Sequence, residues 1–191
     1  MPHVVRCLPV AISRRNLPLS SERILDAAEG IARAEGVGAL SMRRVAAELG
    51  TGAMSLYNHV PNKDALLAGL AERVLAQVEV PVGASQRELA ASWVRSVRKT
   101  FIANRQLLPL VFTMPRRTMI VSIARTLVEA LMKTGMDGDE ARSVTAILGR
   151  YVAGALVFDG NRRGDPTTLE GDFDRGLAAL LDGLDLAPPA G

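Results

Sequence analysis

Apolar residues recur at helical spacing through most of this chain, and no segment alternates β-branched with polar residues as a strand would. The first helix begins at Ser20 or Ser21, either of which can act as its N-cap. Gly36 and Gly38 are expected to end it in the left-handed conformation. Further helices are expected over residues 41–49, 53–59, 63–79, 86–104, 116–133, 139–159 and 169–184. The sequence therefore predicts an all-α fold.

Composition places the chain among soluble globular proteins. Its 191 residues suit one large domain or two small ones, and 48% of them are hydrophobic. The single cysteine, Cys7, excludes an internal disulfide and a metal site built from several cysteines, and it fits a reducing cytoplasm. The longest apolar run, 151–158, is far shorter than the roughly 20 residues that a membrane span needs. We therefore expect a cytoplasmic protein with no membrane partner.

The positive charge of the chain is concentrated near its N-terminus. From Met1 to Lys63 there are eight Lys or Arg residues and five Asp or Glu residues, so this third carries the whole net charge of +3. From Asp64 onward there are fifteen of each. A positively charged N-terminal third followed by a neutral remainder is compatible with binding a polyanion such as DNA. A solvated surface without a partner would show the same small excess, so charge alone leaves both readings open.

The segment 41–59 has the length and punctuation of a helix-turn-helix: a helix at 41–49, a turn with glycines at 50–52, and a helix at 53–59. In such a unit the second helix enters the major groove while the first supports it. The second helix exposes groups that can bond to bases or phosphates, namely Ser55, Tyr57, Asn58 and His59, and Arg43 and Arg44 can reach phosphates from the first. Two ordinary helices joined by a tight turn would have the same periodicity.

Three short motifs in and directly after this segment resemble the signature of the TetR family, namely Ala46–Gly50, Leu56–His59 and Asn62–Leu67. The second motif contains Tyr57 and His59 in the pattern Tyr-x-His, which looks most similar to the motif of the branch that contains the tetracycline repressors. The resemblance implies DNA contacts from Arg43, Ser55, Tyr57, His59 and Lys63. Asn58 stands where that branch has tryptophan, and Ala53 and Met54 stand where it has glutamine and proline, so the operator should differ. Partial packing of Tyr57 in the core and helix capping by His59 remain alternatives.

The segment 149–158 resembles the eighth helix of that branch, which pairs with the last helix across a twofold axis. Small residues at 153–155 allow close helix approach, and a helix that is apolar all round needs burial. The resemblance implies a homodimer, with the central helix of a monomeric core as the alternative. The residues expected at the interface are Tyr151, Gly154, Ala155, Phe158, Leu177 and Leu181. The expected organisation is a basic arm over 1–19, a DNA-binding domain over 20–67 linked by the helix 63–79, a ligand-binding and dimerisation domain over 84–184, and a tail over 185–191.

The ligand of the tetracycline repressors is a magnesium chelate held in part by a histidine of the ligand domain. Here Val111 stands near that place, and no histidine follows His59, so we expect no metal and no cofactor. Apolar residues could instead line a pocket for a small hydrophobic effector, or they could simply fill the core. The residues expected at the pocket are Trp93, Val97, Phe101, Asn104, Arg105, Leu107, Leu110, Phe112 and Leu127. Ile102 and Ile120 are also expected to face inward.

These observations predict a sequence-specific transcriptional regulator, with repression favoured by the family, released from a palindromic DNA operator by the effector. The alternative is a DNA-binding regulator without a small-molecule ligand, controlled by protein contacts. An enzyme is not expected, because the region after His59 has no histidine or cysteine, no carboxylates at catalytic spacing and no glycine-rich phosphate loop. Arg14 and Arg15 in the N-terminal arm could enter a minor groove or belong to a disordered tail.

Overall fold

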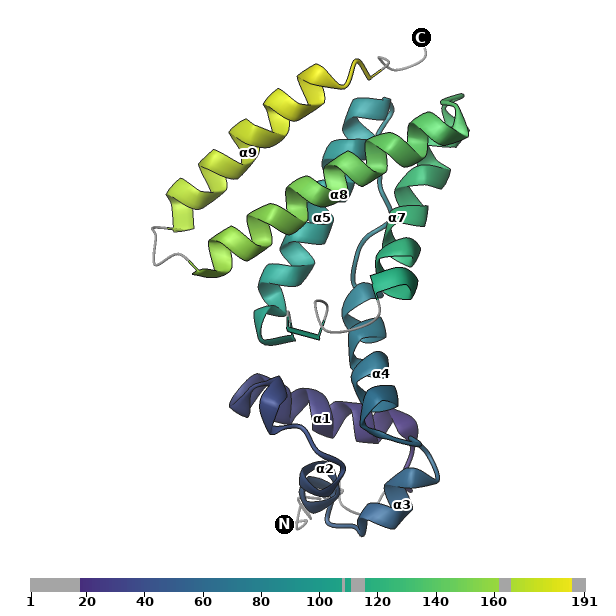
Figure 1. The fold of residues 1–191 in the computed structure, drawn as a ribbon, viewed down its shortest axis with the longest axis vertical. Helices are drawn as coiled ribbons and strands as arrows, with labels where there is room; N and C mark the ends of the chain where they lie inside the picture. Colours follow the sequence, from purple (N-terminus) through teal and green to yellow (C-terminus); the bar gives the residue numbers. More distant parts are fainter. Residues whose placement is uncertain (1–17, 108, 111–115, 162–165, 187–191) are drawn as a thin grey trace, which may run out of the picture. The chain divides into compact units, whose positions relative to one another are not determined.

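The computed structural model describes residues 18–107, 109–110, 116–161 and 166–186, with the backbone alone given for 116–120, 159–161 and 166–168. Throughout these residues the secondary structure is helical, without a strand (Figure 1). The all-α prediction is confirmed. The chain forms two compact units, Met1–Leu66 and Leu67–Gly191, with the boundary inside helix α4. The helices are α1 (Ser21–Glu35), η2 (Val37–Ala39), α2 (Met42–Leu49), α3 (Ala53–Tyr57), α4 (Lys63–Leu75), α5 (Gln86–Ala103), η3 (Arg105–Leu107), α7 (Arg116–Lys133), α8 (Gly138–Asn161) and α9 (Pro166–Gly183).

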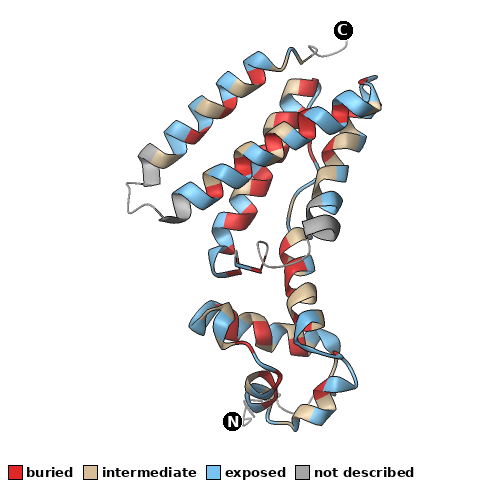
Figure 2. Cartoon of the chain, viewed as in Figure 1, coloured by how far each residue is buried: buried red, intermediate tan, exposed pale blue. Residues whose placement is uncertain are grey.

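The first unit is built on α1, which begins and ends where its capping residues predict. The hydroxyl of Ser20 accepts a hydrogen bond from the Arg23 amide at 3.3 Å, and Gly36 ends the helix with a φ of 85°. Gly38 was expected to be left-handed as well, and this is wrong, because the chain turns directly into the 3₁₀ helix η2. Apolar residues from α1, α2, α3 and the segment before α2 form the core of this unit (Figure 2): Ile24, Ala28, Ile31, Leu40, Val45 and Leu56.

The core of the second unit is formed where α5, α7 and α8 pack together, and α9 packs on α5 and α8 (Figure 1). Helix α5 begins with a capping box, in which Ser85 and Glu88 each accept a backbone amide hydrogen bond from the other. Two ion pairs tie α5 to α9, Arg87–Asp182 at 2.8 Å and Arg95–Asp174 at 3.2 Å. The two arginines are eight residues apart, as are the two aspartates, and the first arginine pairs with the second aspartate. The two helices therefore run antiparallel.

The chain between α4 and α5 is attached to α5 by four polar side chains spaced four residues apart, Ser92, Ser96, Thr100 and Asn104, which we call the polar ladder. Ser92 accepts the Val82 amide at 3.0 Å and Ser96 accepts the Glu79 amide at 2.8 Å. Thr100 donates to the carbonyl of Gln77 at 3.3 Å, and the Asn104 amide donates to the Gln77 side chain at 3.0 Å. A four-residue spacing places all four side chains on one face of α5.

Besides Gly38 and small shifts at the ends of α8 and α9, three details differ from the sequence prediction. Helix α4 ends at Leu75 rather than 79, because the polar ladder binds backbone groups of the following segment. Helix α3 ends at Tyr57 rather than 59. Ile102 is 44% exposed although it was expected to face inward, because its neighbour Phe101 takes the inward position about 100° away around the helix.

Among the described residues, one helix is long and apolar enough to cross a membrane, and it is α8 over Gly138–Phe158. Core helices of proteins outside membranes meet the same criteria of length and composition. Every third or fourth position of α8 is buried within the chain, as Val144, Leu148 and Val152 illustrate. The pattern is that of a helix with one face in a protein core.

Candidate nucleic-acid interface

Helices α2 and α3 form a helix-turn-helix whose ends are fixed by local hydrogen bonds. The hydroxyl of Ser41 caps α2 by accepting the Arg44 amide at 3.1 Å. Gly50 ends α2 in the left-handed conformation, with φ 65° and ψ 33°, a region that favours glycine. The chain then extends through Gly52 and enters α3, whose Leu56 is fully buried. This arrangement holds the outer face of α3 toward solvent.

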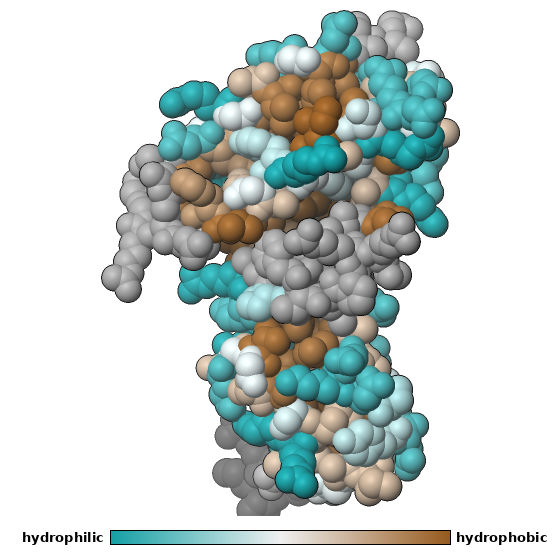
Figure 3. All heavy atoms as spheres, in the orientation of Figure 1, coloured by the Kyte–Doolittle hydropathy of each residue, from teal (hydrophilic) through white to brown (hydrophobic). Residues whose placement is uncertain are grey.

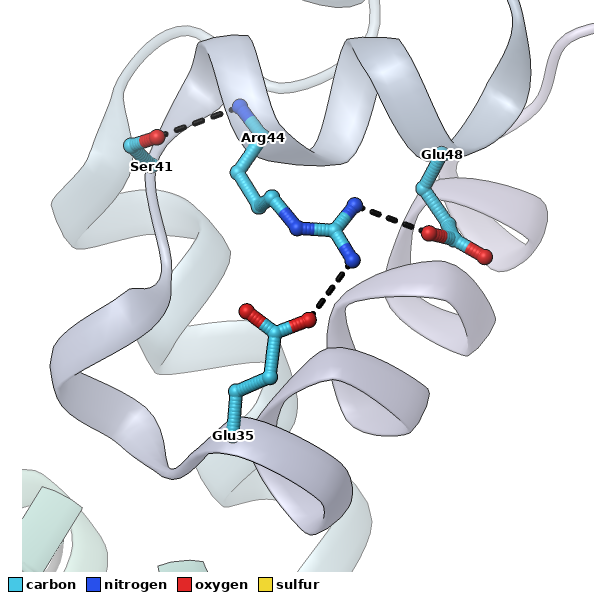
Figure 4. Close-up of polar contacts among 4 residues, drawn as sticks. All are labelled: Glu35, Ser41, Arg44 and Glu48. Carbon is cyan, nitrogen blue, oxygen red and sulfur yellow. Dashed lines mark hydrogen bonds and ion pairs between the residues drawn. The ribbon is translucent and has the colours of Figure 1, made fainter.

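Arg44 is bound to two carboxylates within the first unit (Figure 4). Its guanidinium donates to Glu48 one turn along α2 at 2.8 Å and to Glu35 at the end of α1 at 2.6 Å. The hydrogen bond to Glu35 and, to a smaller extent, the one to Glu48 raise the pKa of Arg44 above its ordinary value. Arg44 therefore connects α2 to α1. This pairing was not predicted from the sequence.

The other polar side chains expected to contact DNA lie at the surface of the unit. Arg43 is exposed and makes no ion pair with any described residue. Tyr57 is 44% exposed, Asn58 and His59 are exposed, and Ser55 is half-buried. No described group bonds to the His59 imidazole, so His59 does not cap the helix through its side chain; its carbonyl accepts from Ser21 at 3.4 Å.

Lys63 is exposed at the first position of α4, next to the cap of that helix. The Asn62 side chain accepts the Ala65 amide at 2.8 Å, as the sequence predicts for a cap. Together with Arg43, Asn58 and His59, Lys63 gives the unit exposed donors in the segment from α2 to the start of α4. Arg14 and Arg15 of the N-terminal arm lie outside the described residues.

The segment 24–70 matches the family model described as bacterial regulatory proteins, tetR family. Apo ActR from Streptomyces coelicolor, described in its ligand complexes as a TetR family protein, has the same fold with a TM-score of 0.74. It is 30% identical, and the match covers 88% of this chain and 95% of ActR. The chain belongs to the TetR family. This confirms the family predicted from the sequence and makes the helix-turn-helix its DNA-binding element.

Two further relatives extend the comparison for this TetR-family protein. The HTH-type transcriptional repressor DrrR1 of Streptomyces coeruleorubidus is 44% identical over 88 residues, which are 46% of this chain and 33% of DrrR1. The chain thus aligns with about one third of that relative's length. BioQ, crystallised with its natural double-stranded DNA operator, is 26% identical with a TM-score of 0.69, covering 87% of this chain and 98% of BioQ.

Most of the residues expected at the ligand pocket lie inside the second unit of this TetR-family protein. The buried ones are Trp93, Val97, Phe101, Asn104, Leu107, Leu110 and Leu127. The Trp93 indole donates to the Ile123 carbonyl of α7 at 3.2 Å, so its N–H is already satisfied. Arg105 is exposed, and Phe112 and Val111 lie outside the described residues. No cluster of three or more His, Cys, Asp or Glu residues suited to a metal occurs in the described part of the chain.

The buried polar atoms without a hydrogen-bond partner in the described part of the second unit include two on uncharged side chains. One is the Oδ1 oxygen of Asn104, whose amide nitrogen is bound to Gln77 and to the Thr100 carbonyl. The other is the hydroxyl of Thr145 on α8, 2% exposed, which the sequence prediction did not include. The spacing of apolar residues does not distinguish a buried threonine such as Thr145 from the polar residues on the helix surface. An unpaired buried polar group is costly, so such a group is a candidate for binding a ligand.

The residues expected at the dimer interface fall into two groups. Leu177 and Leu181 are buried within the chain, and the Tyr151 hydroxyl donates to the Phe173 carbonyl at 2.6 Å, holding α8 to α9. Arg98 of α5 stacks over the Phe173 ring at 4.4 Å. By contrast, Gly154 and Phe158 are exposed and Ala155 is half-buried. Val157 is 49% exposed and was not predicted, although it adjoins Phe158 on α8.

Proposed function

We propose that this TetR-family protein is a transcriptional repressor that binds a palindromic operator as a homodimer and leaves it when a small hydrophobic effector binds. Residues 20–67 bind DNA, and residues 84–184 hold the effector and dimerise. The observation that carries the proposal is the helix-turn-helix itself, which is packed on its inner face by Leu56 and Val45 and presents Arg43, Asn58 and His59 to solvent. That BioQ binds an operator and that DrrR1 is a repressor support the same role here.

The dimer is supported by the outer surface of α8. Val157 and Phe158 are 49% and 64% exposed, and a Cβ added at Gly154 would meet no atom within 4 Å. Apolar side chains gather over α8 on the face that Figure 3 shows. Exposed apolar residues beside a small residue suit close packing against a second helix. A symmetric dimer would then present two recognition helices about 34–36 Å apart, one turn of DNA.

A hydrophobic effector is supported by the interior of the second unit, where aliphatic and aromatic side chains of α5 and α7 meet. The Oδ1 oxygen of Asn104 after α5 and the hydroxyl of Thr145 on α8 are each candidates to bind a hydrogen-bonding group of a ligand. ActR has been crystallised with actinorhodin and with (S)-DNPA. On this proposal the protein acts in the cytoplasm, without a cofactor and without enzymatic activity.

A regulator controlled by protein contacts, with no small ligand, is the second candidate. The feature that would fit it is the exposed apolar surface of α8, since that surface could receive another protein as well as a second copy. A thermal-shift screen with hydrophobic compounds separates the two. Stabilisation of the purified protein by a compound that also releases DNA supports the effector, and a screen without any stabilising compound supports protein control.

The test of DNA binding is selection of bound duplexes from a random pool, followed by affinity measurements on the selected site. Recovery of a palindrome is the expected result. The double variant Tyr57→Ala with His59→Ala should lose specific binding while its helical circular dichroism and dimer mass are retained, because both side chains are at the surface. Arg33→Ala is the matched control, since Arg33 is also exposed in the first unit but pairs with Glu29 at 2.6 Å. A folded double variant with wild-type affinity would contradict the proposal.

A further inference from the structure

Helix α3 exposes a large apolar side chain that the sites described above leave unused. Met54 is 78% exposed, and Leu56, two residues later, is fully buried. Successive residues of an α-helix are about 100° apart, so two residues separate by about 200°. Met54 therefore lies on the side of α3 opposite to the residue that anchors the helix. It occupies the outermost line of the helix surface.

No charged residue accompanies Met54 in this part of the chain. From Leu49 to Asn62 there is no Lys, Arg, Asp or Glu. Contacts of arginine or lysine with guanine, and of carboxylates with cytosine, are therefore not available from α3. Asn58 can bond to adenine, and Arg43 of α2 remains for guanine or phosphate. Met54, the outermost side chain of the recognition helix α3, must therefore recognise an apolar group of a base.

We propose that Met54 contacts the C5-methyl group of a thymine in each half-site and thereby helps to determine the operator sequence. This inference rests on the proposed function, because it requires α3 to enter the major groove. The thymine methyl is the apolar group that the four bases of unmodified DNA present there. A methionine side chain has several rotatable bonds and can settle against that methyl, removing both from water. The resulting preference is for an A·T pair with thymine at one defined position.

The experiment uses the full-length protein and the operator obtained by selection, with each thymine replaced in turn by deoxyuridine, which lacks only the methyl group. Replacement at one position, made in both half-sites, should weaken wild-type binding about tenfold, as burial of one methyl-sized group per half-site implies. Replacement elsewhere should have little effect. Met54→Ala should bind the thymine and the deoxyuridine operators equally. Met54→Leu, which keeps an apolar side chain, should keep the discrimination.

The control variant is Met132→Ala, which removes a methionine that is 48% exposed on α7 in the other unit and should leave the discrimination at the wild-type value. Thermal unfolding of each variant checks that the fold is retained. The inference is overturned if wild-type protein binds every deoxyuridine operator as tightly as the parent, or if Met54→Ala keeps the wild-type discrimination. A selection that yields no specific site overturns the proposed function as well, whereas a specific site without methyl dependence overturns this inference alone.

Discussion

Arg43 and Arg44 are neighbours on α2, yet they stand in different electrostatic surroundings. Arg44 is neutralised by Glu35 and Glu48 within the first unit. Arg43 faces solvent and has no carboxylate partner among the described residues. A guanidinium without a partner can displace counterions from DNA, whereas one already bound to two carboxylates adds little net charge to the surface. At the scale of single residues, we therefore expect Arg43 to serve DNA binding and Arg44 to serve the assembly of the first unit.

Arg43→Ala is therefore expected to weaken DNA binding about tenfold at low salt without lowering the melting temperature. If Arg43 contacts a phosphate, the slope of log affinity against log salt should also fall by about one per protomer. Fluorescence anisotropy with the selected duplex over a series of salt concentrations measures both quantities. Unchanged affinity and slope would show that Arg43 stays in solvent in the complex.

Arg44→Ala should behave differently, because its loss leaves Glu35 and Glu48 close together without the cation between them. We expect a lower melting temperature, with the salt slope of the remaining folded protein close to that of the wild type. Differential scanning calorimetry and the same anisotropy series test this. An Arg44→Ala protein with wild-type melting temperature and a reduced slope would instead assign Arg44 to DNA contact.

At the scale of elements, two glycines on α8 and α9 have opposite surroundings. A Cβ at Gly176 would lie 2.6 Å from the Tyr151 hydroxyl, so α9 packs against α8 at this point through the absence of a side chain. A Cβ at Gly154 would meet no atom within 4 Å. Gly176 therefore serves packing within the chain, and Gly154 lies on the part of α8 where we expect a second protomer to pack.

Gly154→Arg should convert the dimer to a folded monomer, because the new side chain has space within the chain but would bury an unpaired charge between protomers. Sedimentation velocity measures the change, and circular dichroism checks the fold. Gly30→Arg is the matched control, since Gly30 is likewise open and lies on α1 in the first unit. A Gly154→Arg protein that remains fully dimeric would place the interface elsewhere.

A second prediction at the scale of elements concerns Ser96, a member of the polar ladder on α5. Ser96 is 7% exposed and accepts the Glu79 amide at 2.8 Å. Ser96→Ala leaves that amide without its acceptor and should reduce the free energy of unfolding by about 1 kcal/mol. Urea unfolding followed by circular dichroism tests this, with Ser143→Ala on the exposed side of α8 as the control. Equal stability of the two variants would mean that water replaces Ser96.

For the whole molecule, the question is which ligand the second unit would accept on the proposed function. The residues expected around a pocket are apolar except for Asn104 and Arg105, and Arg105 is exposed. Magnesium prefers oxygen ligands in near-octahedral geometry, which aliphatic side chains do not supply. The effector of this protein should therefore bind without a metal.

Titration with tetracycline, with and without magnesium, is the direct measurement. We expect no tight binding that depends on the metal, and we expect hydrophobic compounds to raise the melting temperature whether or not a chelator is present. Isothermal titration calorimetry reports the first and a thermal-shift assay the second. Tight tetracycline binding that disappears on chelation would contradict the metal-free effector and leave the DNA-binding role intact.

The sequence by itself determined the helices, most of their ends and the family. Capping by Ser20, Ser41 and Asn62 was readable because a cap bonds to an amide three residues away. The glycines at 36 and 50, both with positive φ, end α1 and α2 for equally local reasons. The helix-turn-helix was readable from spacing and from its motifs, since its length and turn are set within some twenty residues.

The tertiary structure decided which faces of these helices meet. The pairing of Arg44 with Glu35 joins residues on different helices, and the ladder that ends α4 joins residues 10 to 27 positions apart. Leu177, expected between protomers, is fully buried within the chain, while Val157 is exposed. Periodicity shows that a residue lies on the apolar side of its helix, but burial against the same chain and burial against a second chain both stabilise apolar residues by removal from water. The packing of α8 with α9 was needed to separate them.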